Sequence, residues 1–177
     1  DANMNLAVIL KELGKLEEAL IYARKEIDNW PNKQAPFLLL NSLIKECDIS
    51  LHSKEEIRCI LRKLLPRKDI SHTDLFAAIN QLIPDSTLKE LNKTKSSIIN
   101  HKNFLELIQD KEISKSMRLL VFSRIDWEIT LTRIRRDICI ETSKRNIEKN
   151  KFLIEFVISL AEQCFLNEYV YLQTKNE

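Results

Sequence analysis

A single glycine, Gly14, occurs in the 177 residues of this chain, whereas average usage would make about 7% of a chain glycine. Only glycine adopts positive φ angles freely or lets the backbone approach a phosphate closely. Dinucleotide-binding sheets, P-loops, the kinase glycine loop and the nucleophile elbow depend on such backbone. The sequence therefore disfavours these enzyme classes. With 44% hydrophobic and 31% charged residues, it predicts a folded, charge-rich, all-α chain.

The segment from Asn5 to Pro31 has the pattern of two helices joined by a turn at Gly14. Small side chains at Ala7 and Ala19 allow the paired helices to approach closely, and Pro31 ends the second helix. Such a helical hairpin is typical of a tetratricopeptide repeat (TPR). The expected apolar stripes are Leu6, Ala7, Leu10 and Leu13 in the first helix, and Leu16, Ala19, Leu20, Ala23 and Ile27 in the second. Ala23 and Glu26 depart from the TPR pattern, which indicates a terminal or degenerate unit.

A second, degenerate hairpin is predicted for residues 32–66, between Pro31 and Pro66. Its first helix covers Pro36 to about Glu46, and its second begins at the Ser-Lys-Glu-Glu capping box that starts at Ser53. The apolar stripe that follows comprises Ile57, Ile60, Leu61, Leu64 and Leu65. We therefore place TPR-like hairpins in residues 1–66, with the clear unit at 1–31, and a helical bundle domain in residues 67–177.

The predicted bundle is irregular. Residues 71–74 should cap a helix that ends before Pro84, residues 85–101 should form one short helix within a mobile loop, and short helices should cover 104–108 and 117–125. Asp126 should cap a long helix. Its expected buried stripe is Trp127, Leu131, Ile134 and Ile138. The last helix should start near Asn150 and be packed on two sides, since Ile154 and Ile158 lie off its main apolar face. That face comprises Leu153, Phe156, Val157, Leu160, Ala161, Cys164 and Phe165.

Three stretches carry a family resemblance: NLAVILKELGKLEEAL at 5–20, IDWEITLTRIRRDIC at 125–139 and FLIEFVISLAEQCFLNEYVYLQTKNE at 152–177. Together they resemble a bacterial family of TPR-containing proteins with a downstream S-adenosylmethionine-dependent methyltransferase-like domain. The resemblance implies that this chain is the repeat and helical region that precedes the catalytic domain. A methyl-donor site needs a strand, a Gly-rich turn and an acidic ribose ligand, which this sequence lacks. The resemblance therefore implies no catalytic residue and no cofactor-binding residue in this chain.

Two other kinds of site receive little support from the sequence. Cys47, His52, Cys59 and His72 have metal-ligand chemistry, but their spacing lacks the close pairs of structural zinc sites, so we expect no metal. The carboxylate pairs are one or two residues apart on helices or fit capping roles, so we expect no catalysis. These pairs are Glu17 and Glu18, Asp126 and Glu128, and Glu162 and Glu168.

The charge and hydropathy of the chain limit the kinds of partner that it is expected to bind. Basic residues at 58, 62, 63, 67 and 68 and at 133, 135 and 136 could contact phosphates, but helix-surface ion pairs explain them better, and aromatic residues for stacking are scarce. The net charge of +2 also makes a nucleic-acid partner the weaker expectation. The apolar stretches are too short to cross a membrane. Four cysteines without a secretory signal indicate reduced thiols and a cytoplasmic protein.

The resulting prediction is a non-catalytic protein-interaction or architectural module, whose partner is a protein or a further domain of the same polypeptide. Asn5, Val8 and Glu12, on the first helix, should line a groove for a partner segment or for further repeats. Tyr169 and Tyr171 should either pack back on the bundle or dock onto a following domain. Two alternatives remain: a substrate-positioning region of a methyltransferase, which rests on the resemblance, and an RNA-binding helical module.

Overall fold

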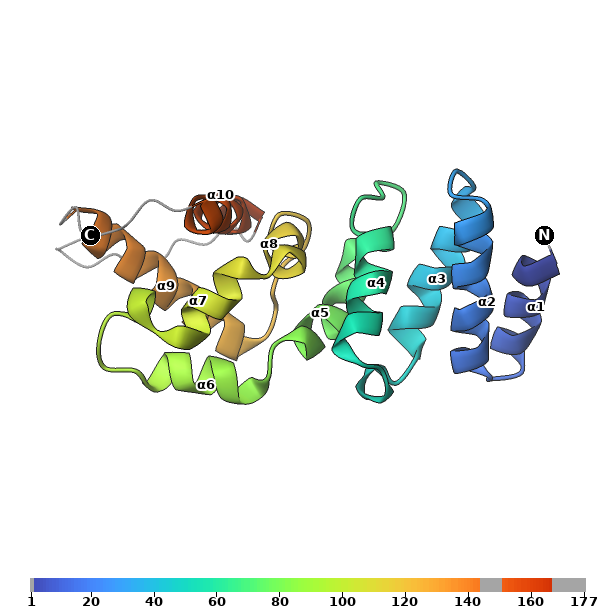
Figure 1. Cartoon of the computed structure of the whole chain (residues 1–177), viewed down its shortest axis with the longest axis horizontal. Coiled ribbons are helices and arrows are strands. Elements are labelled where there is room, and N and C mark those ends of the chain that lie inside the picture. Colours follow the sequence, from blue (N-terminus) through green and yellow to red (C-terminus); the bar gives the residue numbers. More distant parts are fainter. Residues whose placement is uncertain (1, 144–150, 167–177) are drawn as a thin grey trace. The chain divides into compact units, whose positions relative to one another are not determined.

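The computed structural model describes residues 2–143 and 151–166, and every regular element in these ranges is a helix (Figure 1). The prediction of an all-α chain is therefore confirmed. The chain divides into two compact units, residues 1–82 and 83–177. The division does not follow Pro66, where we had expected it. Residues 67–82 belong to the first unit because Leu75 and Ile79 are buried there and their segment packs on the preceding helices.

The first unit is a succession of helices in which neighbours along the chain pack together (Figure 1). Its elements are α1 (Ala2–Glu12), α2 (Leu16–Asn29), α3 (Gln34–Glu46), the 3-10 helix η1 (Ile49–Leu51), α4 (Lys54–Leu64), the 3-10 helix η2 (His72–Leu75) and α5 (Phe76–Leu82). The expected stripe of α4 is buried, from Ile57 to Leu65. This unit therefore gains its core from contacts between consecutive helices.

The hairpin of α1 and α2 forms as the sequence predicts. Gly14 lies between the helices with φ of 74°, a left-handed conformation that other residues adopt at a cost. Ala7 and Ala19 are both fully buried, which is consistent with close contact between the helices. Leu6 and Leu13, however, are exposed and do not belong to the core as expected. Leu13 directly follows the last residue of α1, Glu12, and its amide still donates to the Ile9 carbonyl oxygen at 3.0 Å. The helical spacing therefore continues to Leu13, but on the exposed side of the helix.

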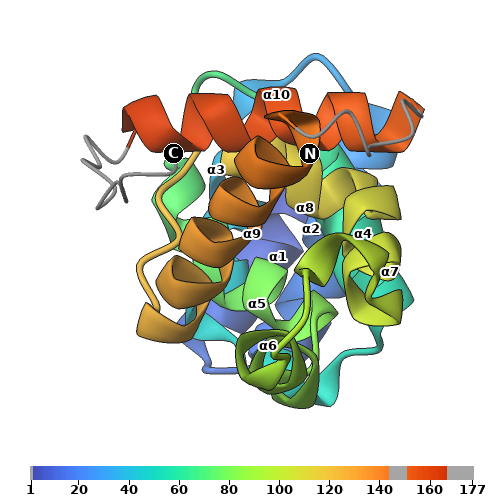
Figure 2. The ribbon, with the colours of Figure 1, turned by 90° about the vertical axis from the view of Figure 1, so that its left-hand side faces the viewer.

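The second unit has a less regular arrangement. Its elements are α6 (Asp85–Lys93), the 3-10 helix η3 (Ile98–Asn100), α7 (Lys102–Gln109), α8 (Lys111–Met117), α9 (Ile125–Ser143) and α10 (Lys151–Leu166). Within this unit, α6 and α10 lie on opposite sides with α9 between them (Figure 2). The predicted stripe of α9 is buried, and the Trp127 ring makes an edge-to-face contact with Phe122 at a centroid distance of 4.9 Å.

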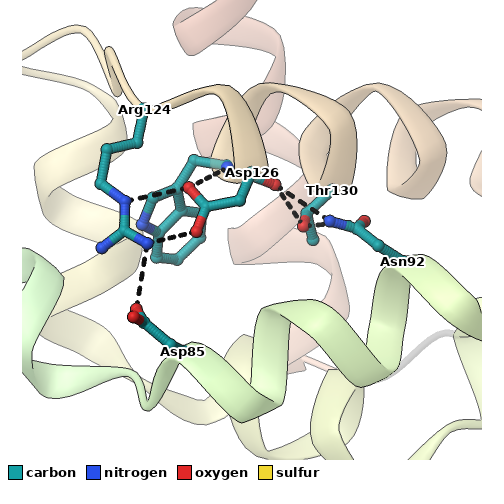
Figure 3. A network of polar contacts seen from close by, with 6 residues as sticks. Asp85, Asn92, Arg124, Asp126 and Thr130 are labelled. Carbon is teal, nitrogen blue, oxygen red and sulfur yellow. Dashed lines mark hydrogen bonds and ion pairs between the residues drawn. The ribbon is translucent and has the colours of Figure 1, made fainter.

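Polar side chains join α6 to the start of α9 (Figure 3). Arg124 donates from Nε to Asp126 Oδ1 and from Nη2 to Asp85 Oδ1, each at 3.0 Å. Thr130 Oγ1 donates to Asn92 Oδ1 at 3.0 Å, and Asn92 Nδ2 donates to the Asp126 carbonyl oxygen at 3.2 Å. The sequence predicts Asp126 as the cap that precedes the helix, but it is the second residue of α9. Its side chain therefore lies in the first turn of the helix. The network fixes where α9 begins relative to α6.

Three further expectations for this unit were wrong in whole or in part. Residues 117–125 do not form a helix, because the helix in this region is α8 and the segment after it is a loop anchored by buried Leu120 and Phe122. In the segment 85–101 the predicted short helix is present as α6, but the remainder also contains η3, and Leu88, Leu91 and Ile98 are buried. On α10, Ile154, Ile158 and Phe165 are exposed, so that helix is not packed on two sides. The other predicted core residues of α10 that are exposed or half-buried are Val157, Ala161 and Cys164.

Candidate functional site

The outer face of α1 is the candidate interaction surface of the first unit. Asn5, Val8 and Glu12, predicted to contact a partner, are all exposed on this helix. Beside them runs an exposed apolar row, which we name the α1 apolar row. It consists of Leu6, Ile9 and Leu13. The three-to-four-residue spacing of this row is the one with which a helix buries side chains against another helix.

The orientation of this face follows from the contacts that α1 makes with its own unit. Ala7 and Leu10 are the buried residues of α1, and Lys11 reaches from its flank to α3. The Lys11 ammonium lies 2.8 Å from Glu46 Oε1 and donates to Ser42 Oγ. The hydrogen bond from Lys11, reinforced by one from Ser42, holds the pKa of Glu46 below its ordinary value. α1 is thus held on one side, and the α1 apolar row lies on another.

The cysteines and histidines with metal-ligand chemistry have other surroundings in the structure. His52 Nε2 lies 2.9 Å from Glu17 Oε2, and Glu17 is also close to Cys47. Burial, with the nearby Glu17 carboxylate, raises the pKa of the Cys47 thiol to about 12. This thiol stays protonated at neutral pH and is a poor nucleophile or metal ligand. No group of three potential metal-ligating side chains occurs in the part of the chain that the structure describes, and none of the four cysteines forms a disulfide there.

The basic residues considered for phosphate contacts are largely engaged within the protein. Lys63 pairs with Asp28, and Arg67 donates from Nε to Asp69 at 2.8 Å while covering the Phe37 ring. The sequence predicts that Arg133 pairs along its own helix. In the structure it donates instead to main-chain carbonyl oxygens at the end of α6 and in the segment after it. These belong to Leu91 (2.9 Å), Asn92 (3.0 Å), Thr94 and Ser96 (3.1 Å). These contacts give both arginines a structural role within the protein.

The remaining predicted sites have structural partners or lie outside the described residues. Glu18 lies 3.5 Å from Lys15, and Glu162 lies 3.6 Å from Arg118. Trp127 is fully buried, so it belongs to the core. Tyr169, Tyr171 and Glu168 lie outside the described residues. Within the described ranges, no helix has the length and apolar composition needed to cross a membrane.

A second candidate site, which the sequence analysis missed, lies between α8 and α10. A pocket of about 500 Å³ is lined there by Lys111, Lys115 and Arg118. Among the described residues, neither lysine has an ion-pair partner. The positions 111, 114, 115 and 118 follow helical spacing, and this signal could have indicated one polar face. The other wall, from α10, is separated by some forty residues of sequence and could not have been assigned by pattern.

Comparisons with known proteins do not test the predicted family relationship. No protein-family model matches the chain, and neither a curated protein nor a solved structure matches it.

Proposed function

We propose that this chain is a non-catalytic protein-interaction module whose first unit binds a helical segment of a partner protein through the outer face of α1. The observation that carries the proposal is the α1 apolar row, where Leu13 is 67% and Ile9 51% exposed. Three large apolar side chains in a row are costly to leave in water. Their spacing matches the side chains of a packing helix better than those of an extended strand, which repeat every second residue.

The same unit supports a TPR-type arrangement as part of the proposal. The hairpin of α1 and α2 has buried alanines at the helix contact and a glycine at the turn, as such repeats require. In a stack of this kind each inner helix is covered by a neighbour on either side. A helix placed on the α1 apolar row would add one layer to that stack, whether it came from a partner protein or from a further repeat. Asn5 and Glu12 would lie at the edge of that contact.

The test compares capture of binding proteins by the intact, tagged chain with capture by two variants. Ile9→Glu combined with Leu13→Glu should abolish capture of the specific partner, because a carboxylate cannot be buried in an apolar contact without a large cost. Ile21→Glu is the matched control, since Ile21 lies on α2 and is 51% exposed, like Ile9. Far-UV circular dichroism should show that both variants remain folded. Equal capture by the double variant and the control would refute the proposal.

A further inference from the structure

The pocket between α8 and α10 has features of a binding site that the α1 surface does not share. One wall is a face of α8 and the residue after it, where Lys111, Ser114, Lys115 and Arg118 line the pocket. The opposite face of α8 is buried and includes Ile113 and Met117. One side of this short helix is therefore used for packing, and its cationic side faces the pocket.

The second wall comes from α10 and fixes the position of the arginine. Ser159, buried in the unit, accepts a hydrogen bond from Arg118 Nε at 3.0 Å and donates to the Glu155 carbonyl oxygen at 2.9 Å. Glu162 Oε2 lies 3.6 Å from the same Nε atom. Among the described residues, no hydrogen bond engages the two terminal nitrogens of Arg118. The guanidinium is thus held at one nitrogen while its terminal donors remain for a ligand.

The charge of the pocket favours a dianion. Three cationic side chains line it against one carboxylate, that of Glu155, which has a cation of its own in Lys151 at 3.8 Å. Glu162, which does not line the pocket, lies beside Arg118, so the excess positive charge is that of the two lysines. Lys111 and Lys115 have no carboxylate partner in the described part of the chain. Like charges placed together repel one another unless a counter-ion joins them. A phosphate group, which carries nearly two negative charges at neutral pH, matches this set better than a carboxylate does.

The pocket also has an apolar portion, which favours a ligand with an apolar group. Phe152 and Ile108 also line it, and the Phe152 side chain is 41% exposed, so one aromatic side chain borders the cations. A bare phosphate would leave these side chains in water. A flat apolar group attached to the phosphate would cover them while its anion contacts the cations.

We propose that this pocket binds a phosphate monoester carried on an aromatic group, with Lys111, Lys115 and Arg118 contacting the phosphate and Phe152 contacting the ring. This site is separate from the α1 surface, so the proposed interaction module does not depend on it. Two sources share the chemistry: a phosphorylated tyrosine side chain and a nucleoside monophosphate.

The first experiment titrates the full chain with phenyl phosphate at low ionic strength and follows the amide NMR signals of α8 and α10. Binding should shift signals within 111–118 and 152–159, and added salt should weaken it because the contacts are exposed. Inorganic phosphate and benzoate should each bind at least about threefold more weakly, since one lacks the ring and the other the second charge. Equal binding of benzoate would overturn the phosphate assignment, and equal binding of inorganic phosphate would overturn the role of Phe152.

Variants locate the contact. Lys115→Gln should weaken phenyl phosphate binding about threefold, and Lys111→Gln with Lys115→Gln about tenfold, as expected for partly exposed charge contacts. Lys89→Gln is the matched control, because Lys89 is an exposed lysine of the same unit that does not line the pocket. Its affinity should equal that of the wild type. If the control weakens binding as much as the double variant, the attraction is diffuse and the site is refuted.

A final comparison distinguishes the two sources. Phosphotyrosine and adenosine monophosphate are titrated in the same way, and the tighter ligand identifies the source. If neither shifts the signals of α8 and α10, the proposal fails regardless of the result with phenyl phosphate.

Discussion

Ala19 in the first unit and Arg133 in the second serve the same purpose, to hold one helix beside another, by different physical means. Ala19 is fully buried in the hairpin of α1 and α2, where its small side chain lets two consecutive helices approach. Arg133 donates hydrogen bonds from α9 to carbonyl oxygens at the end of α6, about forty residues earlier. The first contact needs only neighbouring sequence, whereas the second needs the unit to be folded already.

This difference separates the two units in general. In the first, consecutive helices pack and their loops are short, so most of the core arises between neighbours in sequence. In the second, α9 binds α6 through Arg133 and the Ile98 amide through Asp137, whose Oδ2 accepts that bond at 2.8 Å. α10 also packs on α7 and α8 rather than mainly on α9. Local pattern accounts for most of the first arrangement, and the second depends on contacts between segments far apart in the sequence.

The largest expected effect is the loss of the core of the second unit. Trp127→Ala should lower the free energy of unfolding by about 4 kcal/mol, because a fully buried tryptophan is lost and a cavity remains. Trp30→Ala is the matched control, since Trp30 is 51% exposed, and should cost less than about 1 kcal/mol. Urea unfolding measures both. Equal costs would mean that Trp127 does not anchor this unit.

The next effect tests the polar contacts of α9. Arg133→Ala should lower the free energy of unfolding by about 2 kcal/mol, because several main-chain carbonyl groups at the end of α6 lose their donor. Hydrogen exchange should accelerate in α6 more than in α2. Arg62→Ala, which removes an exposed ion pair with Glu55, is the control and should change stability by less than about 1 kcal/mol. Uniform acceleration across both units would contradict a local role for Arg133.

A smaller effect tests local sequence in the first unit. Ser53→Ala removes the capping box of α4, in which Ser53 Oγ accepts from the Glu56 amide and Glu56 accepts from the Ser53 amide. The free energy of unfolding should fall by about 1 kcal/mol. Ser53→Asp, which can still accept from the Glu56 amide, should retain most of the stability. If both variants lose the same amount, the cap contributes little and the apolar stripe of α4 alone carries the helix.

The features that could be predicted from the sequence are those that depend on local contacts. The turn at Gly14, the cap at Ser53 and the stripes of α4 and α9 could be predicted because each depends on residues within one or two helical turns. The spacing from Leu10 predicts that Leu13 is buried, but Leu13 lies just past the last residue of α1 and is exposed. A periodic pattern does not show where its helix stops unless a cap or proline marks the end.

The failures in the second unit have a different cause. The apolar pattern from Met117 to Ile125 predicts a helix, yet the segment between α8 and α9 is a loop in which Leu120 and Phe122 are buried. Leu88, Leu91 and Ile98 are spread through a polar segment, so their burial was not apparent from local composition. The pocket at Lys115 and Ser159 likewise combines two helices that only the tertiary fold brings together. By contrast, Asn5, Val8 and Glu12 could be assigned to an exposed face from helical spacing alone.

The smallest expected effect concerns the polar contact through which Lys11 joins α1 to α3 in the first unit. Lys11 holds the pKa of Glu46 below its ordinary value of 4.5. A lowered pKa in the folded state stabilises the protein above the unfolded value and loses this contribution as pH falls through the folded value. Lys11→Met should therefore cost about 0.5 kcal/mol at pH 7, as an exposed ion pair does, and the difference from the wild type should vanish in acid.

A thermodynamic cycle isolates this contact. Unfolding is measured between pH 7 and pH 3 for the wild type, Lys11→Met, Glu46→Gln and the double variant. In the Glu46→Gln background the effect of Lys11→Met should no longer depend on pH, because the titrating partner is gone. A pH dependence that persists there would assign the effect to another carboxylate. If none appears even in the wild-type background, α1 is held to α3 by apolar packing alone, and the contrast between the two units is sharper than the Lys11 contact now makes it.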